Sequence, residues 1–193
     1  MKATKDYGVA FSWFGIIGVA TFIIAWICAA SIDTAWEFGV NTLSEFGISN
    51  TDARFYFNYG CMITGALIAL FGFGHAVSAK NAGHTAGGVL FVIGGVFLAL
   101  IGIVTMDVGN GNLHNYVAIS SALFLFMGMI AVGAGNWFSD QKMFGGITVI
   151  FACMFVAMFF AYDVAKIEAY GIILAMIWFL IESVRMIMTA KKN

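Results

Sequence analysis

The 193-residue sequence contains no proline, and only 10% of its residues are charged. A soluble domain usually carries about 25% charged residues, because water must solvate its surface. The scarcity of charge therefore excludes an ordinary water-soluble fold. The absence of proline excludes proline-kinked helices, and the sequence shows no pair of broken helices of the kind that forms many transporter sites.

Cysteine is also scarce, and Cys28, Cys61 and Cys153 all lie within apolar runs. They lack the Cys-x-x-Cys and Cys/His spacings that indicate redox or zinc sites. We interpret them as small hydrophobic residues, and we expect no metal and no cofactor. The net charge of −1 gives no general attraction to nucleic acid, so no nucleic-acid partner is expected.

Hydrophobic residues make up 62% of the chain and gather into six long runs. About 20 helical residues, each rising 1.5 Å, cross the roughly 30 Å hydrocarbon core of a bilayer. The first run exceeds the roughly 7 to 15 apolar residues of a secretory signal, so we expect it to be a helix of the protein. The sequence predicts an all-α membrane protein, a single six-helix domain over residues 1–193. The expected spans are residues 9–30, 55–77, 85–106, 115–135, 143–162 and 169–188.

Basic residues are unevenly divided between the two sets of connections. If the N-terminus is cytoplasmic, only Arg54 and Lys166 of the nine lysines and arginines fall outside. Short segments rich in these residues stay in the cytoplasm, so the sequence predicts that both termini are cytoplasmic. The same assignment places most of the acidic residues on the outer face.

The connection at residues 31–54 is the longest between the predicted spans, and it contains Trp36, Phe38 and Ile48 among other apolar residues. Long connections in compact folds are usually functional or disordered, and this one is too aromatic for disorder. Aromatic side chains gather where a membrane meets water. We therefore predict an ordered interfacial segment at the outer surface.

Within this segment, Thr42 and Glu45 have the spacing of a capping box, in which two side chains satisfy backbone N–H groups at a helix start. Gly47 follows where a short helix would end. The sequence predicts a short helix over residues 42–46. Ser44 and Glu45 then serve either as local caps or in chemistry.

The connection after the third predicted span contains Asp107 and His114, seven residues apart. A carboxylate can orient an imidazole as a general base, which would activate a serine within its reach. Ser44, His114 and Asp107 are therefore the candidate catalytic residues, with Glu45 as the alternative acid. The structural alternative is that Asp107 ends one helix and His114 caps the next. One histidine on this side provides too few ligands for a typical zinc site.

Asn58 lies one turn inside the second predicted span, where an amide is costly unless it is hydrogen-bonded. We expect it to pair with another helix or with the long connection. These residues together predict an outer-leaflet pocket roofed by residues 36–48 and floored by Asn58, Asp107 and His114. The candidate ligand-binding residues are Trp36, Glu45, Asn58 and His114, and the expected ligand is a membrane lipid.

Two features are expected at the cytoplasmic side. His75 and His84 flank a connection that contains Lys80, and we expect both imidazoles simply to end their helices, without a ligand. Glu182 and Arg185 are spaced i, i+3 near the end of the sixth predicted span. This spacing predicts an ion pair whose charges extend toward water.

Gly88, Gly95 and Gly102 recur every seven residues in the third predicted span, which places them on one helix face. Small residues let a neighbouring backbone approach closely. We expect packing against another helix, either within this chain, in another membrane protein or in a second copy.

Three motifs carry a resemblance to a known family: Thr42 to Gly47 in the long connection, Phe57 to Gly60 at the start of the second span, and His114 at the start of the fourth. With these motifs the chain resembles the prokaryotic membrane proteins grouped as domain-of-unknown-function family 998. The resemblance implies a six-helix bundle in a bacterial or archaeal cytoplasmic membrane. It directs attention to Ser44, Gly47, Asn58 and His114 but implies no activity. A proline common near Asp107 in the family is missing.

Two functions are compatible with these patterns, and the sequence does not decide whether the protein is an enzyme. The first is a lipid-binding or accessory protein that recognises membrane lipids in the outer pocket or contacts other membrane proteins through its glycine faces. The second is a lipid-modifying enzyme, a hydrolase or acyltransferase, that uses Ser44, His114 and Asp107.

Overall fold

Six long helices and two short 3-10 helices form the computed structural model, which describes residues 2–192 and the side chains of residues 8–189. Each long helix is long and apolar enough to cross a membrane. This confirms the predicted all-α, six-helix membrane fold. The elements are α1 Lys2–Ile32, η1 Leu43–Ile48, α2 Ala53–Val77, α3 Ala82–Ile101, η2 Val108–Gly111, α4 Asn112–Trp137, α5 Lys142–Ala161 and α6 Val164–Lys192.

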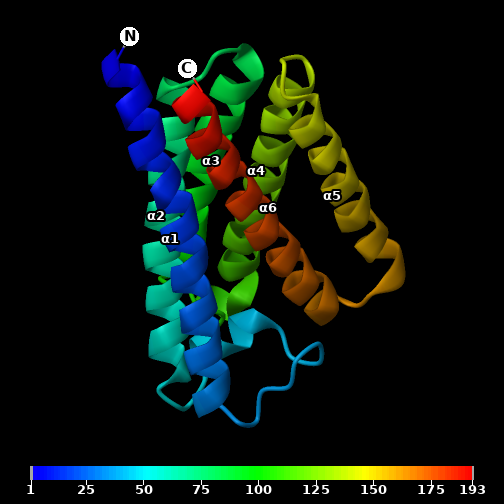
Figure 1. Ribbon diagram of the computed structural model, residues 1–193. Coiled ribbons are helices and arrows are strands. Elements are labelled where there is room, and N and C mark those ends of the chain that lie inside the picture. Colours follow the sequence, from blue (N-terminus) through cyan, green and yellow to red (C-terminus); the bar gives the residue numbers. More distant parts are fainter. Residues whose placement is uncertain (1, 193) are drawn as a thin grey trace.

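Both termini lie at the same end of the bundle, and the long connection between α1 and α2 lies at the opposite end (Figure 1). We call these the inner and outer ends, following the orientation predicted from the lysines and arginines. Consecutive helices from α1 to α5 pack side by side, and α6 packs against α1 and α5.

Glycines let α2 and α3 approach closely. A Cβ atom on Gly65 of α2 would overlap the carbonyl oxygen of Gly95 and the backbone nitrogen of Ala99 in α3. Gly88 and Gly102 are likewise pressed against the backbone of α2. The seven-residue glycine repeat therefore serves packing within this chain.

The long connection is folded into the outer end. Leu43 and Phe46 of η1 are completely buried and pack with Phe57 and Cys61 of α2. The predicted short helix over residues 42–46 is present as the 3-10 helix η1. The connection therefore closes the outer end of the bundle as an ordered lid.

Helix α5 is the least embedded of the six long helices. Only Gly145 and Thr148 are buried in it, both in its inner half. Toward the outer end α5 diverges from α4 (Figure 1), and Phe160 is 88% exposed. In a bilayer these apolar side chains face lipid.

Candidate functional site

The lid uses two of the predicted ligand-binding residues to hold its own shape. The Trp36 indole N–H donates to the carbonyl oxygen of Thr42 at 2.9 Å, and its ring stacks on Phe46. The Glu45 carboxylate accepts hydrogen bonds from the Thr42 N–H at 2.7 Å and from the Asn41 amide at 2.8 Å. Both side chains are engaged in the lid and leave little capacity for a ligand.

Hydrogen bonding sets the charge state of Glu45. Partial burial opposes its ionisation, but the hydrogen bonds from the Thr42 N–H, the Asn41 amide and the Thr42 hydroxyl outweigh burial. They hold the pKa of Glu45 below its usual value. The hydrogen bonds within the lid therefore favour the ionised form of the Glu45 carboxylate.

Acidification is expected to loosen the lid. A carboxyl whose pKa is lowered by folding stabilises the fold above its unfolded pKa of about 4.3, and this stabilisation is lost as the pH falls through the folded pKa. Trp36 fluorescence, taken as the difference from a Trp36→Phe variant, should report a transition below about pH 4.3. The Glu45→Gln variant should lack this transition, and a transition that persists in it would contradict the role given to Glu45.

Ser44 has a partner that the sequence analysis did not identify. Its hydroxyl donates to the Glu168 carboxylate at 3.2 Å, and the Leu43 N–H donates to the same carboxylate at 2.9 Å. Glu168 belongs to α6, which begins at Val164 instead of near residue 169. The sequence signal for this contact was an acidic residue near the start of the sixth span. The predicted span began at residue 169 and therefore left Glu168 in the connection.

His114 and Asp107 also have separate partners. The His114 Nδ1 lies 2.6 Å from the carbonyl oxygen of Val104, so Nδ1 carries a proton, and the buried Nε2 atom has no partner among the described residues. Asp107 is exposed and accepts a hydrogen bond from the Thr105 hydroxyl. Among the described residues no hydrogen bond joins any two of Ser44, Asp107 and His114. The hydrogen bonding therefore gives no support to the predicted catalytic triad.

Asn58 connects α2 to the lid. Its side-chain N–H donates to the carbonyl oxygen of Gly47 at 3.1 Å, while no residue that the structure describes donates to its buried Oδ1. Within the described part of the chain the outer end therefore contains two buried side-chain atoms without hydrogen-bond partners, Asn58 Oδ1 and His114 Nε2. Each atom can accept a hydrogen bond from a water molecule or from a ligand hydroxyl.

An open groove of about 410 Å³ runs between α1 and α2 in the outer half of the bundle. Its lining comes from α1 and α2, and not from the lid residues 36–48 that roof the predicted pocket. The residues that line it are Thr21, Ile24, Ala25, Phe55, Tyr56, Tyr59, Gly60 and Ile63. At its outer rim the exposed Arg54 guanidinium lies 4.8 Å from the Phe55 ring centre.

The inner end contains a buried charged pair that differs from the prediction. Glu182 and Arg185 are 2% and 5% exposed, and the guanidinium donates three hydrogen bonds to the carboxylate. The predicted extension toward water is therefore wrong: both charges point into the bundle, because polar partners on α2 and α4 surround them. His75 of α2 lies with its Nε2 2.7 Å from the Glu182 carboxylate.

The network extends to two more elements. His84 of α3 pairs with Asn136 of α4 at 2.9 Å, and Asn136 donates in turn to Glu182. Arg185 donates to Gln141 in the α4–α5 turn at 2.7 Å. The spacing of Glu182 and Arg185 was visible in the sequence, but their contacts with α2, α4 and the α4–α5 turn were not.

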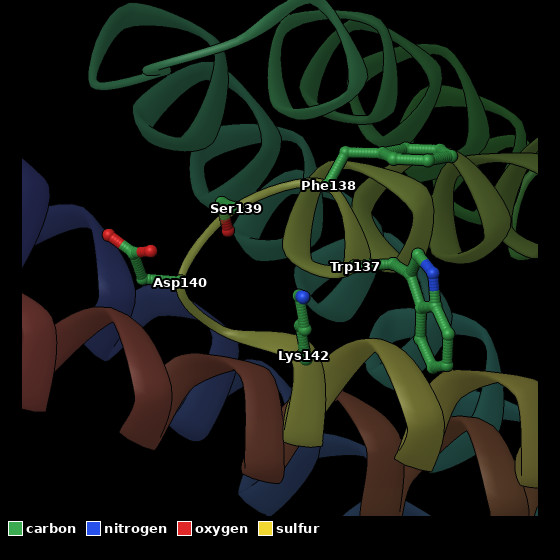
Figure 2. Close-up of a pocket in the computed structure, with 5 residues that line it drawn as sticks. All are labelled: Trp137, Phe138, Ser139, Asp140 and Lys142. Carbon is green, nitrogen blue, oxygen red and sulfur yellow. The ribbon is translucent and has the colours of Figure 1, made fainter.

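The α4–α5 turn forms an open hollow of about 650 Å³ at the inner end. Figure 2 shows the Lys142 side chain directed into the turn, with the Phe138 ring pointing away from it. The hollow is lined by Trp137, Phe138, Ser139, Asp140 and Lys142. Within the described part of the chain no group of acidic, histidine or cysteine side chains has the arrangement of a metal site.

Comparison with known proteins identifies the family. A family model described as "Protein of unknown function (DUF998)" matches residues 16–185. No curated protein and no solved structure gave a match. The matched region runs from α1 into α6 and includes the lid, the groove and the inner network. The chain therefore belongs to domain-of-unknown-function family 998, as its motifs predicted.

Proposed function

We propose that this multipass membrane protein binds an amphipathic lipid in the α1–α2 groove. The observation that carries the proposal is an apolar groove in the outer half of the bundle with a cation at its rim. The groove would hold an acyl chain, and the rim would hold the head group. The sequence analysis expected the lipid site beneath the lid, whereas the site proposed here lies on the side of the bundle.

The head group must provide most of the selectivity. An acyl chain in the groove gains no hydrophobic energy over one in the surrounding bilayer, because both environments are apolar. Arg54, however, is the second residue of α2, and its exposed guanidinium lies beside Phe55, which lines the groove. A guanidinium favours an anion with planar oxygens, such as a phosphate. The proposed ligand is therefore an anionic lipid.

The enzymatic alternative has weaker support. Ser44 would need an activating base, but its hydroxyl donates to Glu168, and His114 donates to a backbone carbonyl. The hydrogen bonds of both residues serve the closure of the outer end. Binding without chemistry is the function that this geometry favours.

Photolabelling of the full-length protein in nanodiscs tests the proposal. Two probes with the same photoreactive acyl chain are compared, a phosphatidylglycerol and a phosphatidylcholine. One cation near the surface favours an anionic lipid by about 1 kcal/mol, so phosphatidylglycerol should label residues 53–63 about fivefold more strongly. Arg54→Gln should remove the preference.

Lys166→Gln is the matched control, because Lys166 is the other cation expected outside and it pairs with Asp163 away from the groove. The control should keep the preference of the wild type. Equal labelling by both probes in the wild type, or a preference that survives Arg54→Gln, would overturn the proposal.

We also propose that the protein resides in the cytoplasmic membrane of a prokaryote with both termini in the cytoplasm. The division of basic residues and the family resemblance support this. A reporter fused after Asn193 that reads as external would contradict the orientation.

A further inference from the structure

Ionisable groups inside a membrane-spanning bundle are costly, and they usually mark a site where protons or ions act. The lipid groove at the outer end does not use His75, His84, Glu182 or Arg185. We propose that these residues form a buried proton-binding site at the inner end, with His75 as the residue that takes up the proton.

The tautomer of His75 defines the atom that binds the proton. The His75 Nε2 lies 2.7 Å from a Glu182 oxygen that also accepts hydrogen bonds from Arg185, so Nε2 carries a hydrogen and donates it. The Nδ1 atom then carries a lone pair. It is buried and has no partner within the described part of the chain. A proton taken up by the site therefore binds to Nδ1.

Two features favour proton uptake at His75. The Glu182 carboxylate is in direct contact with its ring, and an adjacent negative charge stabilises an imidazolium. His75 also lies in the last turn of α2, where the carbonyl groups at the helix end favour a positive charge.

Three features oppose uptake. Arg185 already neutralises Glu182, the site is buried, and the ring of His84 lies 5.4 Å away. Glu182 and Arg185 come from α6 and His84 from α3, while α4 brings no titratable residue to this end. The titratable residues at the start of α1, in residues 2–7, have side chains outside the described part.

Protonation would change the packing of the inner end. The new Nδ1–H would need an acceptor, and Ser183 Oγ of α6 is also buried without a partner among the residues that the structure describes. The two residues are linked through Phe71, which packs on the His75 ring and lies with Ser183 beside Gly15. To make this contact the His75 ring or α6 must move. Because hydrogen bonds connect this site to α3, α4 and the α4–α5 turn, these elements would also be displaced.

Nitrogen NMR of histidine-labelled protein in nanodiscs tests the proposal directly. The chain has only three histidines, so His84→Gln and His114→Gln variants assign the remaining signals. Between pH 8 and pH 5 the Nδ1 signal of His75 should change from an unprotonated to a protonated nitrogen. The Nε2 signal should stay protonated throughout.

A second variant separates a proton site from a merely structural histidine. In Glu182→Gln the carboxylate charge is gone, so the midpoint of the His75 transition should move by at least one pH unit toward acid, a tenfold weaker proton affinity. If that variant does not fold, the wild-type titration alone decides. A His75 ring that keeps one protonation state from pH 8 to pH 5, or an unchanged midpoint in folded Glu182→Gln, would overturn the proposal. Lipid labelling at the groove is independent of either result.

Discussion

Replacing Glu182 by alanine is expected to lower the free energy of unfolding by about 3–5 kcal/mol. The substitution leaves the Arg185 guanidinium buried without its carboxylate, and it removes the partner of His75 and Asn136. An uncompensated buried charge is much more costly than a lost hydrogen bond. Equilibrium unfolding of the purified protein in detergent micelles measures the change.

Two variants serve as controls for this result. Glu37→Ala removes an exposed carboxylate from the lid and should change the stability by less than about 0.5 kcal/mol. The double variant Glu182→Leu with Arg185→Leu removes both charges together and should recover much of the lost stability, because no charge is left unpaired. A double variant less stable than Glu182→Ala would contradict the view that the unpaired charge is the cause.

Replacing Gly65 by alanine is expected to cost about 1–3 kcal/mol. The added methyl group would overlap the backbone of Gly95 and Ala99, and a backbone cannot rotate away as a side chain can. The α2–α3 interface would have to separate along its length. The same unfolding experiment measures the loss.

Gly146→Ala is the matched control, since it makes the same change within a membrane helix. A Cβ atom at Gly146 would have no neighbour closer than 3.8 Å, so the variant should be as stable as the wild type or up to about 1 kcal/mol more stable. Equal effects at the two glycines would mean that helix propensity dominates and that close packing at Gly65 does not.

The helices were predictable from sequence because each one is a long apolar run, and length and hydropathy alone determine what can span a bilayer. The lid was predictable for a local reason: Thr42 and Glu45 meet within one turn, and their capping spacing is visible in the sequence. Where the interaction is local, the pattern of residues and the structure agree.

The polar contacts between helices could not be predicted, because a single sequence does not show which helix faces meet. Glu168 was assigned to a connection, yet it lies in α6 and holds Ser44 across 124 positions of the chain. Glu182 and Arg185 were paired correctly, but their burial depends on His75 and Asn136, which come from other helices. The groove likewise arises only when α1 lies against α2.

The most direct test of lipid binding is an experimental structure of the protein in a bilayer that contains phosphatidylglycerol. We predict an ordered acyl chain along the α1–α2 groove between Ile24 and Ile63, with its head group beside Arg54. Density for a lipid beneath the lid at Asn58 and His114, with the groove no better ordered than the exposed face of α5, would contradict the proposal.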